Sequence, residues 1–164
     1  MNNYMKRKIL LVEDQALLAL DESRTIEKHG YKVVIAHSGE EAFKTVMEDP
    51  EVSLILMDID LGKGISGSEI AKKILEHRDI PIVFLTSHSE KEMVEKVKNI
   101  TCYGYVLKNS GEFVLIESIH MAFELFEAHK STKEYEEKYR LLAQNSSDVV
   151  TLIDTDFHIT YVSP

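Results

Sequence analysis

Five short runs of apolar residues recur in this chain, and each run stops at a polar or charged residue. Unbroken apolar runs of this length are typical of strands in a parallel sheet that is covered on both faces. The pattern therefore predicts a buried parallel sheet and disfavours a sheet with one face in water. The runs are ILLV (9–12), VVIA (33–36), LILM (54–57), IVFL (82–85) and YVL (105–107).

The segments between these runs carry the signals of amphipathic helices. Residues 15–29 have apolar side chains at helical spacing, and Gly30 follows them as a C-cap. Ser-x-x-Glu capping boxes at 38–41, 66–69 and 89–92 each open a further helix after a strand. The repeated strand–helix order predicts an α/β fold with a doubly wound five-stranded parallel sheet. We expect the flavodoxin-like strand order 2-1-3-4-5.

Polar side chains follow four of the predicted strands at the point where each strand ends. Glu13 and Asp14 follow the first run, Asp58 the third, Thr86 the fourth and Lys108 the fifth. In open α/β sheets, ligands bind beyond the carboxyl ends of the strands, where the strand order reverses. The first and third strands flank that point in the expected order. These side chains should therefore meet in one cleft, with Asp58 at its rim.

Three carboxylates in one cleft repel one another unless a cation neutralises them, and Mg²⁺ prefers oxygen ligands of this kind. A carboxylate beside bound Mg²⁺ can act as a nucleophile toward a phosphoryl group. Lys108 and the Thr86 hydroxyl are suited to bind the phosphoryl oxygens. Each residue alone has an ordinary explanation, such as a helix cap or a solvated turn. Their occurrence at four strand ends favours a phosphoryl-transfer site.

Four motifs at these strand ends resemble the response regulator receiver domains of two-component signalling. The resemblance covers about residues 6–128 and implies a phosphorelay function. It also implies that a histidine kinase or a phosphotransfer protein is the phosphodonor. The motifs are ILLVEDQ (9–15), LILMDIDLGKGISGSE (54–69), PIVFLTS (81–87) and CYGYVLKNS (102–110).

By position, the resemblance implies that Asp58 is the phosphoacceptor. Glu13 and Asp14 would be the acidic pair that binds Mg²⁺ together with Asp58, and the backbone carbonyl of Asp60 would complete the metal site. The positions of Asp60 and His88 line the path of attacking water in the family, so we hypothesise that they set the lifetime of the phosphoryl group. A solvent-facing loop residue is the alternative for His88.

The resemblance also implies roles for three residues of the later strands. Lys108 would contact the phosphoryl group, Thr86 would supply the switch hydroxyl, and Tyr105 would be the aromatic residue whose rotamer reports phosphorylation. The family usually has proline after its lysine, often with a cis peptide, but Asn109 follows Lys108 here. A cis bond before a non-proline residue costs about 2.5–4 kcal/mol. We expect either a reshaped trans loop or stored strain.

The sequence predicts a long helix from Glu112 that continues as a helical linker at 129–144. Residues at heptad spacing form a stripe along it, so we expect a continuous helix that pairs with a second chain in a homodimer. The alternative is a solvated linker helix, and a capping box at 131–134 leaves a break and restart open. The stripe is Met121, Leu125, Ala128, Thr132, Tyr135, Tyr139 and Leu142.

The last segment, 145–164, changes in character. DVVTLID (148–154) and HITYVS (158–163) predict two strands joined by a turn at Thr155 and Asp156. They resemble the start of a PAS domain, and an isolated hairpin is marginal in water, so we expect a truncated N-terminal piece of such a domain. Receiver-then-PAS order is common in hybrid sensor kinases. We therefore expect a histidine kinase as the parent protein, with no turnover by this fragment beyond self-catalysed phosphorylation and dephosphorylation.

Composition limits the partners of the chain. Its 164 residues carry a net charge of −9, which argues against binding to a nucleic-acid backbone. The single cysteine, Cys102, forbids an internal disulfide and suits a reducing compartment. No apolar segment is long enough to cross a bilayer, so we expect a cytoplasmic protein with no direct membrane insertion.

Two other functions remain open from the residues. DID (58–60) resembles the Asp-x-Asp of phosphatases of the haloacid-dehalogenase type, which also form aspartyl phosphates with Mg²⁺. In those enzymes the nucleophile opens the domain, whereas here an acidic pair at 13–14 comes first, which argues against this function. The other alternative is a receiver that is never phosphorylated and serves only as a docking module.

Overall fold

The computed structural model describes residues 7–62, 65–87, 100, 103–145, 151–153 and 158–162. The chain divides into two units, Met1–Phe126 and Glu127–Pro164. The first unit contains a five-stranded sheet and the second a two-stranded sheet. His88, the predicted capping box at 89–92 and the predicted turn at Thr155 and Asp156 lie outside the described residues.

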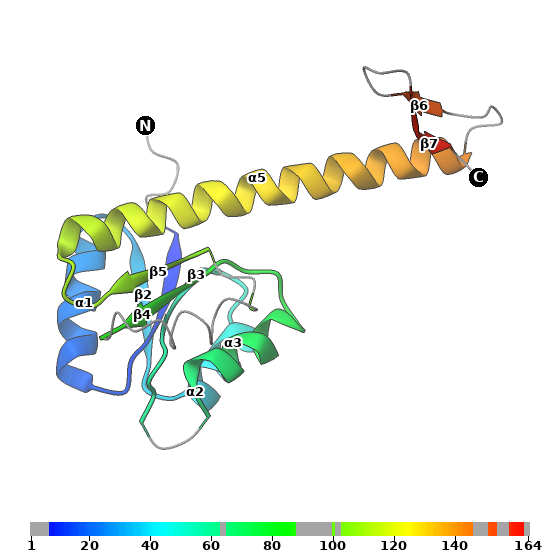
Figure 1. Ribbon diagram of the computed structural model, residues 1–164. Helices are drawn as coiled ribbons and strands as arrows, with labels where there is room; N and C mark the ends of the chain where they lie inside the picture. Colours follow the sequence, from blue (N-terminus) through cyan, green and yellow to red (C-terminus); the bar gives the residue numbers. More distant parts are fainter. Residues whose placement is uncertain are drawn as a thin grey trace. The chain divides into compact units, whose positions relative to one another are not determined.

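Five parallel strands form the sheet of the first unit (Figure 1). Their order is β2-β1-β3-β4-β5, which confirms the predicted order and places β1 beside β3 at the point where the order reverses. Because all neighbouring strands are parallel, their carboxyl ends lie at one edge. The strands are β1 (Lys8–Val12), β2 (Lys32–Ala36), β3 (Val52–Asp58), β4 (Ile82–Thr86) and β5 (Gly104–Leu107).

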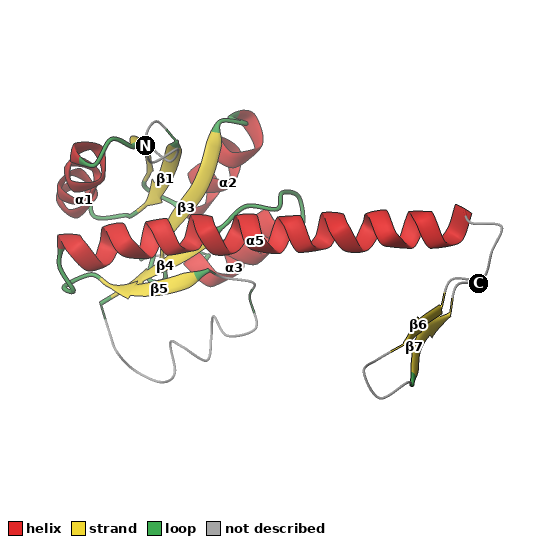
Figure 2. Ribbon diagram, turned by 90° about the horizontal axis from the view of Figure 1, so that it is seen from above, coloured by secondary structure: helices red, strands yellow, loops and turns green. Residues whose placement is uncertain are grey.

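Helices cover both faces of this sheet. Figures 1 and 2 show α1 and the first part of α5 on one face, and α2 and α3 on the other. This double cover explains why the strands are continuous apolar runs and do not alternate with polar residues. The helices are α1 (Ala16–Lys28), α2 (Gly39–Glu48), α3 (Gly67–Leu75) and α5 (Glu112–Asn145).

Successive residues of each central strand point into two separate cores. Leu10 and Val12 of β1 pack toward α2 and α3, whereas Ile9 and Leu11 pack toward α1 and α5. All four side chains are fully buried. Burying a side chain of this kind contributes roughly 1.5–3 kcal/mol relative to leaving it exposed. The two cores therefore hold β1 in place, and with it the residues at its carboxyl end.

The capping signals of the sequence are present at the ends of three helices. Gly30 has a φ of 88° just beyond α1, a conformation that glycine adopts without strain. Ser66 and Glu69 form a complete capping box at the start of α3. Ser38 accepts a hydrogen bond from the Glu41 N–H at the start of α2, but the Glu41 carboxylate accepts from the N–H before Ser38. The box at Ser38 is therefore only half formed.

The second unit begins within α5, which stays helical through the capping box at 131–134. The Thr132 hydroxyl donates to the Ala128 carbonyl one turn earlier, and the helix is continuous here, so the break and restart that the sequence left open does not occur. β6 (Thr151–Ile153) and β7 (Ile159–Val162) pair antiparallel, as the two-strand pattern predicted. Among the described helices, none has the length and apolar character that a membrane span requires.

Candidate functional site

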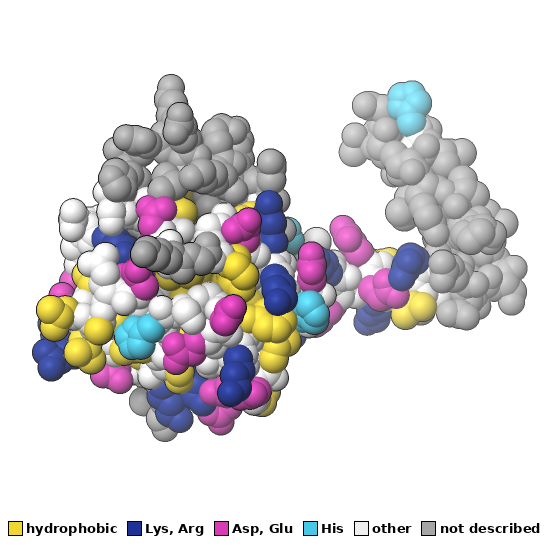
Figure 3. All heavy atoms as spheres, turned by 90° about the horizontal axis from the view of Figure 1, so that it is seen from below, with side chains coloured by type: hydrophobic (Ala, Val, Ile, Leu, Met, Phe, Trp, Pro, Cys, Tyr) yellow, Lys and Arg dark blue, Asp and Glu magenta, His cyan; other side chains and the backbone are white. Residues whose placement is uncertain are grey.

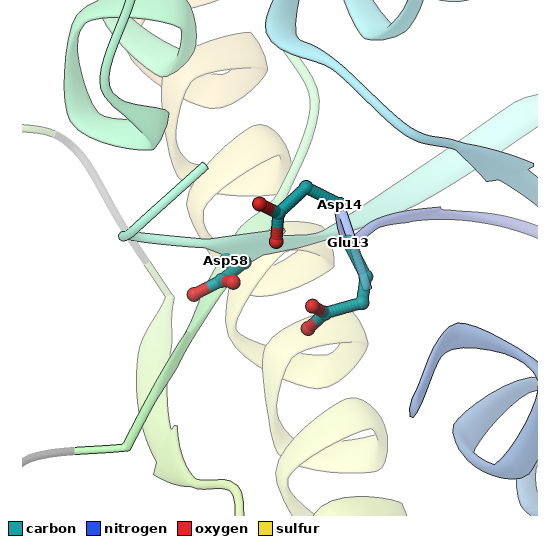
Figure 4. A group of neighbouring side chains, drawn as sticks. All are labelled: Glu13, Asp14 and Asp58. Carbon is teal, nitrogen blue, oxygen red and sulfur yellow. The ribbon is translucent and has the colours of Figure 1, made fainter. Parts of the chain in front are cut away.

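Three carboxylates converge at the carboxyl edge of the sheet. Glu13 and Asp14 follow β1, and Asp58 is the last residue of β3. The two strands are parallel neighbours with Val12 opposite Met57, so both chains leave the sheet at the same edge. One oxygen of each carboxylate lies within 4.8 Å of the others, and Figure 4 shows the three groups around a common space. The structure thus brings together the acids that the sequence placed in one cleft.

The three acids differ in depth. Asp58 is only 3% exposed and Glu13 is fully buried, whereas Asp14 is exposed. The sequence analysis placed Asp58 at the rim of the cleft. The structure places it deeper, with its carboxylate bound by Lys108 and its backbone packed against Gly67 of α3. The accessible side of the acidic cluster is therefore the side of Asp14.

Gly67 is the residue of α3 that packs against Asp58. A Cβ at this position would lie 1.9 Å from the carbonyl oxygen of Asp58, so a larger residue requires the backbone to move. The Gly67 N–H also donates to the Ile59 carbonyl at 3.1 Å. The sequence analysis treated Gly67 only as part of a capping box. The available signal was a glycine inside a helix, where it is unfavourable without a reason in packing.

Lys108 is the cation of the site. Its ammonium donates to Asp58 Oδ2 at 2.8 Å and also bonds Glu13 Oε2. The remaining oxygens of these two carboxylates accept backbone hydrogen bonds, from Asp60 to Asp58 Oδ1 and from Gln15 to Glu13 Oε1, both at 3.1 Å. The two buried carboxylates are therefore fully hydrogen-bonded, as buried charges must be to avoid a large desolvation penalty.

Burial and ion pairing shift the pKa values of Asp58 and Lys108 in opposite directions. Burial raises the pKa of Asp58, and the hydrogen bond with Lys108 opposes that shift. Burial would lower the pKa of Lys108, but its hydrogen bonds with Asp58 and Glu13 outweigh burial and raise this pKa. Lys108 therefore keeps its positive charge at neutral pH and offsets part of the negative charge of the cluster.

Glu13 is held by the neighbouring strand as well. Its N–H donates to the Ala36 carbonyl at 3.0 Å, and the His37 ring donates from Nδ1 to the Glu13 carbonyl at 2.9 Å. Both contacts come from the end of β2. The sequence analysis assigned no role to His37, because a contact to a backbone carbonyl has no signature in sequence.

Thr86 and Tyr105 lie at different depths. Thr86 is buried at the end of β4, and its carbonyl accepts a hydrogen bond from the Lys108 N–H at 2.9 Å. Leu85 pairs with Asp58 across β3 and β4, so Thr86 lies at the same sheet edge as the carboxylates. Tyr105 on β5 is 56% exposed. The peptide bond between Lys108 and Asn109 is trans, so the cis bond that often precedes proline in this position of the family is absent here.

The acidic cluster has the donor set that a hard divalent cation needs. Among the residues that the structure describes, no hydrogen bond reaches the Asp14 carboxylate, so its oxygens are available. Gly62 has a φ of 62°, and a Cβ there would lie 2.7 Å from Asp14 Oδ2. A glycine therefore lets the loop after β3 approach Asp14 closely. The residues present fit Mg²⁺, which binds carboxylate and carbonyl oxygens.

Residues 9–120 match the family model of the response regulator receiver domain. With the strand order and the acidic cluster already described, this match shows that the chain belongs to the response regulator receiver domain family. Such receivers act in two-component signalling, typically with Mg²⁺ at an acidic pocket.

Individual relatives agree with this family. The transcriptional regulatory protein PdtaR from Mycobacterium tuberculosis is 31% identical over 121 residues, which cover 73% of this chain and 58% of PdtaR. The polar-differentiation response regulator DivK from Brucella ovis is 32% identical over 70% of this chain and 94% of its own length. A solved structure, the N-terminal domain of a response regulator/sensory box/GGDEF three-domain protein from Carboxydothermus hydrogenoformans, has a TM-score of 0.70 and 44% identity. The alignment covers 74% of this chain and 98% of the Carboxydothermus domain.

Gly67→Ala tests the close packing of α3 on Asp58. The added methyl group meets the Asp58 carbonyl, so we expect the free energy of unfolding to fall by about 2–3 kcal/mol. Gly111→Ala is the matched control, because its Cβ meets no atom within 4 Å and only its φ of 90° is strained. We expect this control to cost about 1 kcal/mol. Urea unfolding followed by circular dichroism measures both, and equal costs would contradict the packing role.

Proposed function

We propose that this receiver domain accepts a phosphoryl group on Asp58 from a histidine kinase or a phosphotransfer protein, in a reaction that requires Mg²⁺. The observation that carries the proposal is the Asp58 carboxylate, which is held by the Lys108 ammonium beside the acids that follow β1. A nucleophile, a counter-ion for a phosphoryl group and a set of metal ligands therefore lie in one place.

In the proposed step, a carboxylate oxygen of Asp58 attacks the phosphorus atom of a phosphohistidine. The O–P bond forms as the N–P bond breaks, and the released histidine nitrogen takes a proton from solvent. Asp58 must be ionised to act as the nucleophile. Hydrogen bonds from Lys108 and from the Asp60 N–H favour the ionised form and oppose the effect of burial.

Mg²⁺, when bound, would offset the negative charge of the transferring phosphoryl group. Asp14, Glu13 and Asp58 would supply carboxylate oxygens to it, and the Asp60 backbone carbonyl is the fourth proposed ligand. Asp14 is the most available of these groups because it is exposed, whereas Glu13 and Asp58 already accept hydrogen bonds within the protein.

Phosphorylation would change the partners of Lys108. Its ammonium exchanges Glu13 and Asp58 for a phosphoryl oxygen, and the Thr86 hydroxyl donates to a second oxygen. Tyr105, now largely exposed, then moves toward Thr86. The change is a shift between two populated states, and it alters the surface formed by β5 and the first turns of α5.

Acetyl phosphate with Mg²⁺ tests the proposed acceptor. We expect one acid-stable, base-labile phosphoryl adduct by intact-mass spectrometry, and we expect Asp58→Asn to remove it. Asp79→Asn is the matched control, because Asp79 is an exposed acid in the loop before β4. Chelation of Mg²⁺, or Asp14→Asn, should reduce the initial rate of labelling at least about tenfold.

Two results would contradict the proposal. A folded protein that takes no label under these conditions would favour a docking module that is never phosphorylated. Labelling that persists in Asp58→Asn would place the acceptor elsewhere in the chain.

We also propose a receiver at 6–128, a helical linker at 129–144 and the start of a PAS domain at 145–164, in a parent histidine kinase of the hybrid type. Support comes from the unbroken α5, from the antiparallel β6–β7 pair, and from the sensory box named in the Carboxydothermus protein. The structure of a chain extended beyond residue 164 tests the proposal. A fold other than PAS around β6 and β7 would contradict it.

We propose that α5 pairs with a second copy of this chain. The predicted stripe is exposed at each of its six positions whose side chains are described, from Met121 to Tyr139. Two parallel helices would cover this stripe by packing against each other. Nucleic acid is not a proposed partner. The net charge is −9, and on the face in Figure 3 basic side chains are interspersed with acidic ones.

Leu125→Glu tests the proposed dimer by placing a charge in the stripe. We expect light scattering coupled to size exclusion to report a dimer for the unchanged chain and a monomer for this variant. Leu17→Glu, on the exposed surface of α1, is the matched control and should remain dimeric. An unchanged chain that is monomeric at high micromolar concentration would rule out the pairing.

A further inference from the structure

Asp14 is the proposed metal ligand that the protein itself holds least. Its side chain is exposed, and among the described residues no hydrogen bond involves its carboxylate, its N–H or its carbonyl. Glu13 and Asp58, in contrast, accept hydrogen bonds from Lys108 and from backbone N–H groups. Mg²⁺ demands near-ideal octahedral geometry, so the direction of each ligand matters to its affinity. The direction of Asp14 is therefore set by the backbone that carries it.

His37 holds the peptide that joins Glu13 to Asp14. The ring Nδ1 of His37 lies 2.9 Å from the Glu13 carbonyl oxygen. A carbonyl oxygen only accepts hydrogen bonds, so Nδ1 carries the proton and donates it. Within the described part of the chain, no other donor reaches this oxygen. The orientation of the peptide before Asp14 therefore depends on the His37 ring.

The contact from His37 replaces a hydrogen bond of the sheet. β1 and β2 pair in parallel up to Val12 and Ala36, and the Glu13 N–H extends the ladder by donating to the Ala36 carbonyl at 3.0 Å. In a longer parallel ladder, the Ser38 N–H would donate to the Glu13 carbonyl next. Ser38 is instead the N-cap of α2, and the His37 ring takes the place of that donor. The first strand is thus held for one residue beyond the end of its partner.

The backbone of His37 is itself anchored. Its N–H donates to Glu41 Oε2 at 2.7 Å, and the Ser38 hydroxyl accepts from the Glu41 N–H at 3.2 Å. The residue before His37 is Ala36, which is fully buried at the end of β2. The ring therefore projects from a fixed backbone, as a side chain that orients another group requires.

We propose that His37 is a positioning residue of the Mg²⁺ site, where its Nδ1–H holds the Glu13 carbonyl and so directs Asp14 toward the metal. The inference rests on the proposed function, which requires Mg²⁺. Residues behind the direct ligands commonly orient them, and their loss typically lowers metal affinity about 10–100-fold. In His37→Ala, a water molecule can bond the Glu13 carbonyl but does not fix its direction, so Asp14 is no longer held for the metal.

Titration of the ¹⁵N-labelled chain with MgCl₂, without a phosphodonor, tests the role of His37. The shifts of the Gln15 and Asp60 backbone amides give the Kd for Mg²⁺. We expect the Kd to rise about tenfold in His37→Ala, at the low end of the range for such residues. The side-chain N–H of asparagine is as many bonds from its Cα as Nδ1 is in histidine. His37→Asn should therefore restore most of the affinity.

His77→Ala is the matched control for the loss of an exposed ring. The His77 Nδ1 lies 2.9 Å from the Lys73 carbonyl oxygen, so this variant also removes a contact between a ring and a carbonyl group. The contact lies at the end of α3, within one segment of chain, and holds no proposed ligand. We expect the Kd for Mg²⁺ in His77→Ala to equal that of the unchanged chain.

The tautomer of His37 gives a second readout, which needs neither Mg²⁺ nor a phosphoryl group. A long-range ¹H–¹⁵N correlation spectrum of the neutral ring should show the proton on Nδ1. A neutral ring with its proton on Nε2, an unchanged Kd in His37→Ala, or an equal rise in His77→Ala would each overturn the inference. So would a His37→Asn variant that binds Mg²⁺ as weakly as His37→Ala. These outcomes leave the proposed function in place, whereas an unchanged chain that binds no Mg²⁺ would contradict both.

Discussion

The hydrogen-bonded bridge that Lys108 makes between Glu13 and Asp58 is the interaction on which the site depends. Two carboxylates at this depth are each unfavourable by several kcal/mol unless a cation and hydrogen bonds compensate. The sheet order makes the bridge possible, because β1 and β3 are neighbours and their carboxyl ends meet. Lys108 then reaches the two acids from β5, while its backbone stays bonded to Thr86 of the intervening strand.

The same bridge links stability to the proposed chemistry. In the unphosphorylated chain, the ammonium neutralises part of a cluster that would otherwise be strongly repulsive. In the proposed reaction, a metal ion and a phosphoryl group would bring charges of both signs to this place, and Lys108 would exchange its carboxylate partners for phosphoryl oxygens. Under the proposed function, Lys108 would therefore both stabilise the resting state and respond when Asp58 is modified.

The sequence predicted the features that depend on pattern along the chain. Continuous apolar runs placed the strands, and their polar ends placed Glu13, Asp14 and Asp58 together, because parallel strands share one carboxyl edge. The capping box at Ser66 and the long helix from Glu112 also followed from local residues. These features can be predicted from the residue periodicity of strands and helices and from the right-handed crossover rule.

The features that the sequence did not reveal depend on side-chain packing between distant elements. The close approach of Gly67 to the Asp58 backbone depends on the packing of α3 against β3, and the partners of Lys108 depend on the ends of β1, β3 and β5 lying close together. The burial of Glu22 on the inner face of α1 was also not predicted. Glu22 falls on the same helical stripe as Ala19 and Ile26, at spacings of three and four, so its burial was visible in the period of α1.

The most direct test of the account is the structure of the chain with Mg²⁺ and beryllofluoride, which stands in for a phosphoryl group on the aspartate. The account predicts beryllium bonded to a carboxylate oxygen of Asp58, with the Lys108 ammonium transferred from Glu13 to a fluorine atom. A structure in which beryllofluoride leaves Asp58 unmodified, or in which Lys108 still bridges Glu13 and Asp58 after beryllium has bound, would contradict it.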